Sequence, residues 1–584
     1  MKAFLSYKLF LSVAFLFFIM AAMPLLAQDL SQIGRSKKPF KLTGTLSANQ
    51  IYYDAFGIPN RRPPYNYFLS GSVNIGIYGW NVPLSYTYSN QQSQFQQPFN
   101  QFGATPYYKW IKFYAGYNNM IFSSYSLNGH VFLGGGVELK PGIFRFSAMY
   151  GRLNRAIQED TNNVNIVPYY ERMGMGMKIG VGKERNFLDF IFFRGEDNPN
   201  SIRPPMMQTI QPGENAIASF VANKSLTKWV TLSGEYATSA YTNDVRSPVA
   251  TESSVKVLGA NLPGFTNRTT SATSNAYNAK ATYSKDGLTL GVGYERIDPE
   301  YRTMGSYFFN NDFENYTANA GKKFLEGRLN VAGSVGIQRS NLKGDKISGM
   351  NRNIYSANVS FSPTPKLSFS SSYSNFQSVT RVRNQFERLT AATPQDTLQL
   401  NSLDFVQLTQ NANTIINYIV GDPASRYSKN IASLNVTYQN VGNTGAANQR
   451  VAPGANFYNA VASFNRTINP ANVSYTLAMN TNINESIGLR VYLVGPTATF
   501  SKSFFNKKLK GNTSVSWINS YLNRFKINDI LNVRLNITYT IKKQHQFNLS
   551  NTGTYRANYL LPEAANKQPD FFEITMNMGY AFSF

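Results

Sequence analysis

Few side chains of this sequence could carry out acid–base or nucleophilic chemistry near neutral pH. The chain of 584 residues has two histidines, His130 and His545, and no cysteine. A histidine that is oriented by an acid can activate a serine hydroxyl as a nucleophile. The sequence shows no serine and acid that converge on either histidine, and a lone histidine on a strand is more often a structural hydrogen-bonding group. We therefore predict no catalytic residues and no enzymatic activity; a hydrolase that depends on His130 is the weakest alternative.

Acidic residues in polar connections are the other candidates for chemistry. Glu159 and Asp160 are adjacent, and Asp197 precedes an asparagine in a second connection. Oxygen ligands of this kind can bind Ca²⁺, but solvated loop acids are the simpler interpretation. The lack of cysteine excludes disulfides and thiolate-bound metals, and no glycine-rich loop leads from a strand into a helix to hold a phosphate. We predict no metal site and no cofactor.

The elements that carry these residues are predicted to be strands, because apolar and polar residues alternate with a period of two. One stretch shows the alternation over nine residues: Leu531, Val533, Leu535, Ile537 and Tyr539 are separated by Asn532, Arg534, Asn536 and Thr538. Segments of about ten alternating residues suit strands with one face toward lipid and the other toward a polar lumen. Arg534 is therefore a candidate lumen-lining residue.

The connections between these strands alternate in length. Short turns at 79–81, 140–142 and 285–287 alternate with longer polar segments such as 155–169 and 243–273. Short periplasmic turns and longer extracellular loops are typical of transmembrane barrels, and an even strand number places both chain ends on one side. The predicted fold class is all-β: a single large antiparallel transmembrane β-barrel of about 26 strands (24–26).

The N-terminal residues predict export. Lys2 and Lys8 accompany an apolar stretch from Leu9 to Met23, and Ala27 offers a cleavage point. No later segment has the 18 or so consecutive apolar residues of a membrane helix. The predicted organisation is a signal peptide over 1–27, a short periplasmic segment over 28–39 and the barrel over 40–584, located in the bacterial outer membrane.

Composition and charge narrow the class of partner. Aromatic residues make up 14 % of the chain, and aromatics collect at both lipid–water interfaces of a barrel. The four tryptophans lie at predicted turns or toward a strand end, and we expect them at these interfaces: Trp80, Trp110, Trp229 and Trp517. A formal net charge of +25 raises the question of nucleic-acid binding. Because the cations are scattered and form no basic stripe, we predict membrane lipids as partners and no nucleic acid.

The C-terminal strand carries the most specific local pattern. Its last eight residues place a polar residue, a glycine and three aromatic residues at the spacing of an outer-membrane assembly signal: Asn577, Gly579, Tyr580, Phe582 and Phe584. A terminal strand that must pair with the first strand presents an open edge, which an assembly factor can bind by strand addition. We predict the outer-membrane barrel assembly machinery as a partner during biogenesis.

Four segments, 105–110, 115–117, 132–139 and 149–155, give the chain its likeness to a known group. It resembles uncharacterised large outer-membrane β-barrel proteins of the Bacteroidota, and the resemblance extends over most of the chain but implies no biochemical function. TonB-dependent receptors, whose barrels are of similar size, place a plug of more than a hundred residues before the first strand. Only residues 28–39 are available here, so we predict a plugless barrel whose pore is open, narrowed by inward-folded loops or filled by another protein.

Two hypotheses for function follow. The first is a porin-like transport conduit with a polar, cation-bearing lumen, which would favour anionic solutes. The second is a surface scaffold or a component of a secretion apparatus, whose pore is occupied by a partner protein. The sequence does not identify the substrate, the occupant of the pore or the oligomeric state.

Overall fold

The computed structural model describes residues 40–584 except 91–97, 161–165, 207–209, 251–263, 345–350, 376, 380–405, 442–454, 487 and 560–566. The predicted signal peptide (1–27) and N-terminal segment (28–39) lie outside the described residues. Within the described ranges, no helix is long and apolar enough to cross a membrane.

The described residues form 28 strand segments in a single antiparallel sheet. In chain order the segments are β1 (Phe40–Phe56), β2 (Tyr65–Ile77), β3 (Trp80–Ser89), β4 (Gln101–Ala104), β5 (Tyr107–Tyr108), β6 (Ile111–Ile121), β7 (Asn128–Leu139), β8 (Phe144–Asn154), β9 (Arg172–Lys183), β10 (Asn186–Asp197), β11 (Glu214–Ser225), β12 (Val230–Thr242), β13 (Ser271–Lys285), β14 (Leu288–Ile297), β15 (Phe313–Phe324), β16 (Leu329–Ser340), β17 (Asn351–Thr364), β18 (Leu367–Ser374), β19 (Gln377–Val379), β20 (Val406–Val420), β21 (Ser428–Val441), β22 (Ala455–Ile468), β23 (Val473–Ser486), β24 (Leu489–Phe504), β25 (Leu509–Leu522), β26 (Phe525–Ile541), β27 (His545–Asn558) and β28 (Phe571–Ser583). A 3₁₀ turn, Leu325–Gly327, joins β15 to β16.

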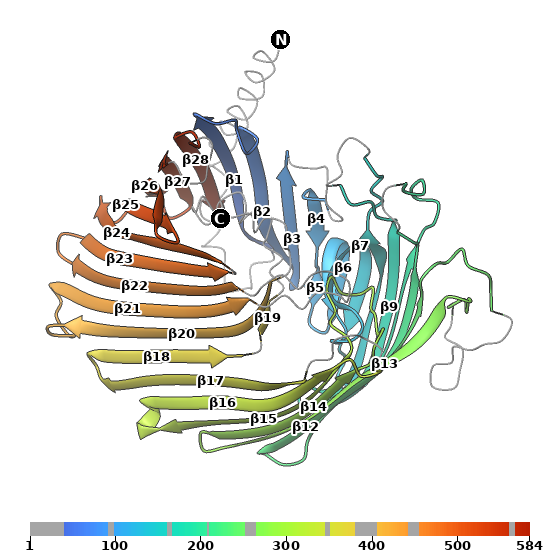
Figure 1. The fold of residues 1–584 in the computed structure, drawn as a ribbon. Coiled ribbons are helices and arrows are strands. Elements are labelled where there is room, and N and C mark those ends of the chain that lie inside the picture. Colours follow the sequence, from blue (N-terminus) through green and yellow to red (C-terminus); the bar gives the residue numbers. More distant parts are fainter. Residues whose placement is uncertain are drawn as a thin grey trace, which may run out of the picture.

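Neighbouring segments pair in chain order and the sheet closes on itself. β4 and β5 both pair with β3 and β6, and β18 and β19 both pair with β20, so each of these two couples is one interrupted strand. The first and last segments, β1 and β28, pair from Thr45↔Ser583 to Phe56↔Phe572, and Figure 1 shows them side by side in the ring. The prediction of a closed antiparallel barrel of 26 strands is confirmed.

The two ends of the barrel differ in their connections. At one end the turns are tight: both residues of Tyr78–Gly79 and of Asp286–Gly287 have positive φ angles, as type I′ hairpins require. At the other end most connections are longer, and two that are described throughout are 122–127 and 298–312. We call these ends the turn end and the loop end.

Alternation along each strand gives the wall two chemically different faces. On β26, Leu531 and Val533 are 40 % and 42 % exposed on the outward face. On the inward face, Asn532 accepts a hydrogen bond from Thr554 at 2.8 Å and Asn536 accepts one from Ser550 at 2.6 Å. Such an apolar exterior is stable only where something other than water covers it.

Outward-facing aromatic rings gather in rows near both ends. Toward the loop end, Tyr236, Tyr277, Tyr294 and Tyr316 lie on four successive strands with ring centroids 6.3, 5.8 and 4.8 Å apart. Toward the turn end, Trp80 stacks on Tyr108 at 5.3 Å. Amphipathic rings at the two edges of an apolar band are the arrangement expected at lipid–water interfaces.

Candidate functional site

The inward face of β10–β13 carries an apolar patch, unlike most of the wall. Five inward side chains from these strands are fully buried: Ile191, Phe193, Ile217, Ala237 and Ala276. They are covered from inside the ring by two segments: 122–127, which connects β6 to β7, and 298–305, the first part of the connection between β14 and β15. In Figure 1 the yellow-green segment that follows β14 runs inside the ring. We call these two connections the inner cluster.

The first connection of the inner cluster is held by two inward carboxylates. The Tyr125 phenol donates to Glu295 at 2.8 Å and accepts a hydrogen bond from the Asn278 amide at 2.9 Å. Glu235, which is 7 % exposed, accepts a hydrogen bond from Ser219 at 3.0 Å. The same carboxylate lies next to the Ser123 side chain and the Ser124 and Tyr125 backbone. Buried carboxylates need hydrogen-bond partners, and here polar groups of the loop and of the wall supply them to each other.

The second connection is bonded to the first. The Tyr301 hydroxyl donates to the Tyr125 carbonyl at 2.8 Å, and the Thr303 hydroxyl donates to the Ser126 carbonyl at 2.7 Å. Gly305 lies so close to this loop that a Cβ there would be 2.6 Å from the Ser126 carbonyl oxygen. The glycine therefore allows the two backbones to meet.

Wall residues of β11 and β12 bind the second connection from the other side. The Asn215 amide accepts a hydrogen bond from the Met304 N–H at 3.0 Å, and the Ser239 hydroxyl donates to the Arg302 carbonyl at 2.7 Å. The inner cluster is thus part of the folded wall and narrows the lumen beside β10–β14.

The inward face opposite is uncharged and polar over long stretches. Asparagine, serine and threonine side chains on β20–β27 bond across neighbouring strands, as Asn413 with Asn435 (2.9 Å), Asn480 with Thr497 (2.9 Å), and Asn512 with Ser501 (2.6 Å). Arg534 shares the inward face of β26 with Asn532 and Asn536, between Ser514 and Thr552 on its two neighbouring strands. Its guanidinium is thereby aimed toward the lumen.

The two histidines lie far apart, on opposite faces of the wall. The His130 ring is 2 % exposed at the loop end of β7, stacks on Tyr307 at 4.0 Å, and its Nδ1 lies 2.8 Å from the Val131 carbonyl. His545 lies in the outward aromatic row at the turn end, 4.8 Å from the Phe582 ring, with its Nδ1 2.7 Å from the Tyr580 hydroxyl. Both rings have packing and hydrogen-bonding roles in the structure.

The candidate acids lie near the loop end. The Asp197 carboxylate accepts two hydrogen bonds from the Arg172 guanidinium, at 2.7 and 3.0 Å. It also accepts one from the Gly213 N–H. Glu159 accepts a bond from the Met206 N–H at 2.8 Å. Among the residues that the structure describes, no group of three or more acidic or histidine side chains is placed to hold a metal ion.

The remaining predicted residues lie in turns and strands of the wall. Trp110, Trp229 and Trp517 are 46 %, 46 % and 54 % exposed, and Trp80 is stacked in the turn-end row. Tyr580 and Phe582 in β28, and Phe584 directly after it, face outward. Asn577 and Gly579 face inward, where Gly579 leaves room for Asn49. Their interface and assembly roles stay predictions.

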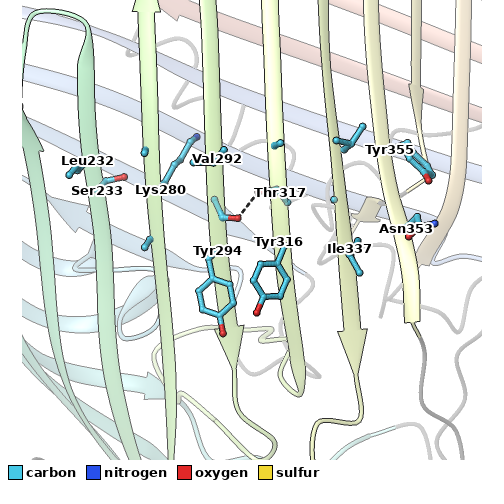
Figure 2. A pocket seen from close by; sticks show the side chains of 16 residues that line it. Leu232, Ser233, Lys280, Val292, Tyr294, Tyr316, Thr317, Ile337, Asn353 and Tyr355 are labelled. Atoms are coloured by element: carbon cyan, nitrogen blue, oxygen red, sulfur yellow. Dashed lines mark hydrogen bonds between the residues drawn. The ribbon is translucent and has the colours of Figure 1, made fainter.

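A groove of about 830 Å³ crosses the outward face of β12–β17. Small residues such as Ala279 and Ala318 form its floor, and Figure 2 shows the Tyr294 and Tyr316 rings next to each other toward one end. Because the exposed Val292 and Ile337 also line it, the groove belongs to the apolar outer surface and not to the lumen.

No protein-family model and no curated protein matches this chain. Solved barrel structures match most of its length. The P pilus usher (PapC) translocation pore has 9 % identity, with 92 % of this chain and 98 % of that chain covered and a TM-score of 0.37. The FrpB iron transporter from Neisseria meningitidis has 11 % identity, with 93 % of this chain and 82 % of that chain covered and a TM-score of 0.35. OccK5 from Pseudomonas aeruginosa has 8 % identity, with 93 % of this chain and 98 % of that chain covered and a TM-score of 0.29.

Proposed function

We propose that this chain is an integral outer-membrane β-barrel of a Gram-negative bacterium that conducts small polar solutes and prefers anions. The observation that carries the proposal is the closed ring with an apolar, aromatic-edged exterior and a hydrogen-bonded polar interior. A barrel of this strand number encloses more space than the side chains of its own wall can fill. The inner cluster narrows that space beside β10–β14.

The anion preference rests on the charges of the inward face. From β20 to β28 the described inward positions carry Lys429, Lys510, Arg534 and Arg556 against Glu573. Fixed cations along a pore lower the barrier for anions and raise it for cations. The lumen of this half of the ring therefore favours anionic solutes.

Biogenesis follows from the same proposal. The segment 1–27 directs export, with cleavage near Ala27, and the C-terminal strand with Phe584 is bound by the barrel assembly machinery. The aromatic rows, to which we assign the four tryptophans, support a position of the wall in the lipid bilayer. We propose no catalytic role, because His130 and His545 are both engaged in packing.

The experiment is a planar-bilayer recording on natively purified protein, together with mass spectrometry of the same sample. An open conduit gives discrete conductance steps and a reversal potential shifted toward that of the anion. Cation preference contradicts the proposal. If no conductance is seen and a second protein is present in stoichiometric amount, the conduit proposal is replaced by the alternative of a scaffold whose pore a partner protein occupies.

A further inference from the structure

A row of side chains crosses four strands on the turn-end side of the inner cluster. Lys112, Glu138, Ser147 and Lys178 stand directly opposite one another where β6 pairs with β7, β7 with β8 and β8 with β9. Figure 1 shows β6, β7 and β9 close together in one part of the ring. Side chains that are directly opposite on neighbouring strands lie about 5 Å apart, so the four form one continuous surface. We call them the lysine row.

The lysine row faces the lumen. Phe113 and Met177, which are next to the two lysines in the sequence, are exposed on the outward face. Tyr114, on the same face of β6 as Lys112, is buried, and its hydroxyl donates a hydrogen bond of 3.1 Å to Glu138. Because side chains alternate along a strand, the row and this hydrogen bond both belong to the inward face.

The two acids of this region are neutralised by cations other than the two lysines of the row. Asp189 accepts hydrogen bonds of 2.7 and 2.8 Å from the Arg145 guanidinium. Glu138 forms an ion pair with Lys140. Among the residues that the structure describes, no carboxylate forms an ion pair with either lysine of the row. The charges of these two lysines are therefore in excess.

Both ammonium groups lie at the edge of the apolar surface that the inner cluster covers. The Lys112 Nζ lies 4.6 Å from the centre of the Tyr114 ring. The Lys178 Nζ lies 5.4 Å from the centre of the Phe122 ring and 3.4 Å from the Ile121 carbonyl oxygen. An ammonium has three N–H donors, and a ring face attracts its charge without accepting all of them. Because both lysines are partly exposed, the remaining donors are open to a solute beside the inner cluster.

We propose that Lys112 and Lys178 form a binding site for a solute that carries two or more oxyanion groups, such as a diphosphate or a polycarboxylate. Ammonium groups attract such oxygens as point charges and donate charged hydrogen bonds to them. The two backbones are three strand spacings apart, about 14 Å, so a solute with two anionic groups can pair with both lysines. The proposal rests on the conduit function for its biological meaning and deepens it, because it names the class of solute that the lumen selects.

The test is isothermal titration of the folded full-length barrel in detergent with pyrophosphate and, separately, with citrate, at constant ionic strength. Lys112→Gln and Lys178→Gln are compared with Lys183→Gln, which removes an exposed lysine from the outward face of the same strand as Lys178. Resistance of the barrel to SDS at room temperature checks that each variant is folded. Hydrogen–deuterium exchange in 122–127 checks that the first connection of the inner cluster keeps its place.

Binding of either probe that weakens at least about tenfold, or about 1.4 kcal/mol, in both Lys112→Gln and Lys178→Gln, and is unchanged in Lys183→Gln, supports the site. Wild-type protein that binds neither probe overturns it, and so does equal weakening in all three variants. Loss of binding in Lys178→Gln alone, with faster exchange in 122–127, also overturns it, because the loss then comes from a displaced loop.

Bilayer recordings separate this inference from the proposed function. Anion-selective conductance without probe binding leaves the conduit and removes the site. Probe binding without conductance leaves the site and removes the conduit.

Discussion

The phenol of Tyr125 donates a hydrogen bond of 2.8 Å to the carboxylate of Glu295, across 170 residues of sequence. This contact joins the connection between β6 and β7 to the inward face of β14. The same phenol accepts a hydrogen bond from Asn278 on β13, so three separate parts of the chain depend on one oxygen. Whether the lumen is narrowed on this side therefore depends on a small number of buried polar contacts.

Tyr125→Phe should loosen the inner cluster. The change removes one donor and one acceptor and leaves the Glu295 and Asn278 side chains without this partner, which costs about 1–3 kcal/mol. We expect larger and noisier single-channel conductance, and faster amide exchange in residues 122–127, with the barrel still closed. The measurements are bilayer recording and hydrogen–deuterium exchange by mass spectrometry.

Tyr236→Phe is the matched control for that change. The Tyr236 hydroxyl donates to the Asn275 side chain at 3.1 Å on the outward face. Conductance and exchange in 122–127 should stay at wild-type values. If both variants alter conductance alike, the Tyr125–Glu295 contact does not control the lumen.

The inner cluster should also open at alkaline pH. Burial raises the pKa of Tyr301 and of Tyr125 well above the ordinary value of 10.0, with the Glu235 and Glu295 charges adding to the shift. A tyrosine whose pKa is raised in the closed state favours closure below about pH 10, and this contribution falls as pH rises further. We expect constant conductance up to about pH 10 and an increase above it. Conductance that falls or stays flat as pH rises past that point contradicts the prediction.

Strand positions and the strand number could be predicted because each strand has its own local signal. Alternation at Leu531–Tyr539 needs no knowledge of the partner strand, and tight turns such as Asp286–Gly287 carry the residues that positive φ angles favour. The parity of a barrel then constrains the count. The inward position of Arg534 follows from the same alternation.

The inner cluster could not be predicted from connection lengths, because a loop that folds inward and one that extends outward look alike in sequence. A signal was nevertheless present. Phe190–Phe193 and Ala216–Ala218 are apolar at every position, and a strand that is apolar on both faces must be covered on both. The contact between Arg61 and Phe571 had no local signal, since the two residues meet only because β1 pairs with β28.

Gly495→Ala should impair folding of the wall. A Cβ at this position would be 1.8 Å from the Trp517 carbonyl oxygen on β25, so one of the two strands must shift. Overpacking of this kind costs about 1–3 kcal/mol. We expect a lower urea midpoint for folding into detergent micelles, measured by the fraction of protein that changes mobility on heating in SDS.

Gly511→Ala is the control on the neighbouring strand. A Cβ there would be 4.0 Å from the Lys502 carbonyl oxygen, which is an ordinary contact distance. The urea midpoint should stay at the wild-type value or rise slightly, because alanine restricts the unfolded chain more than glycine does. An equal loss in both variants would show that side-chain volume in this strand pair, and not the close approach at Gly495, determines the result.

Phe584→Ala should reduce assembly in the cell more than folding in the test tube. The backbone of Phe584 exchanges hydrogen bonds of 2.9 and 3.0 Å with Gly44, and these remain in the variant. The lost side chain packs at 5.3 Å on Phe582, which in turn stacks on His545. If the assembly machinery binds the terminal aromatic residue, the amount of folded barrel in the outer membrane falls several-fold, while folding into detergent changes little.

Phe572→Ala, which removes an outward ring from the other end of the same strand, should leave assembly near wild type. Equal losses for the two variants in cells would mean that the machinery does not distinguish the terminal residue.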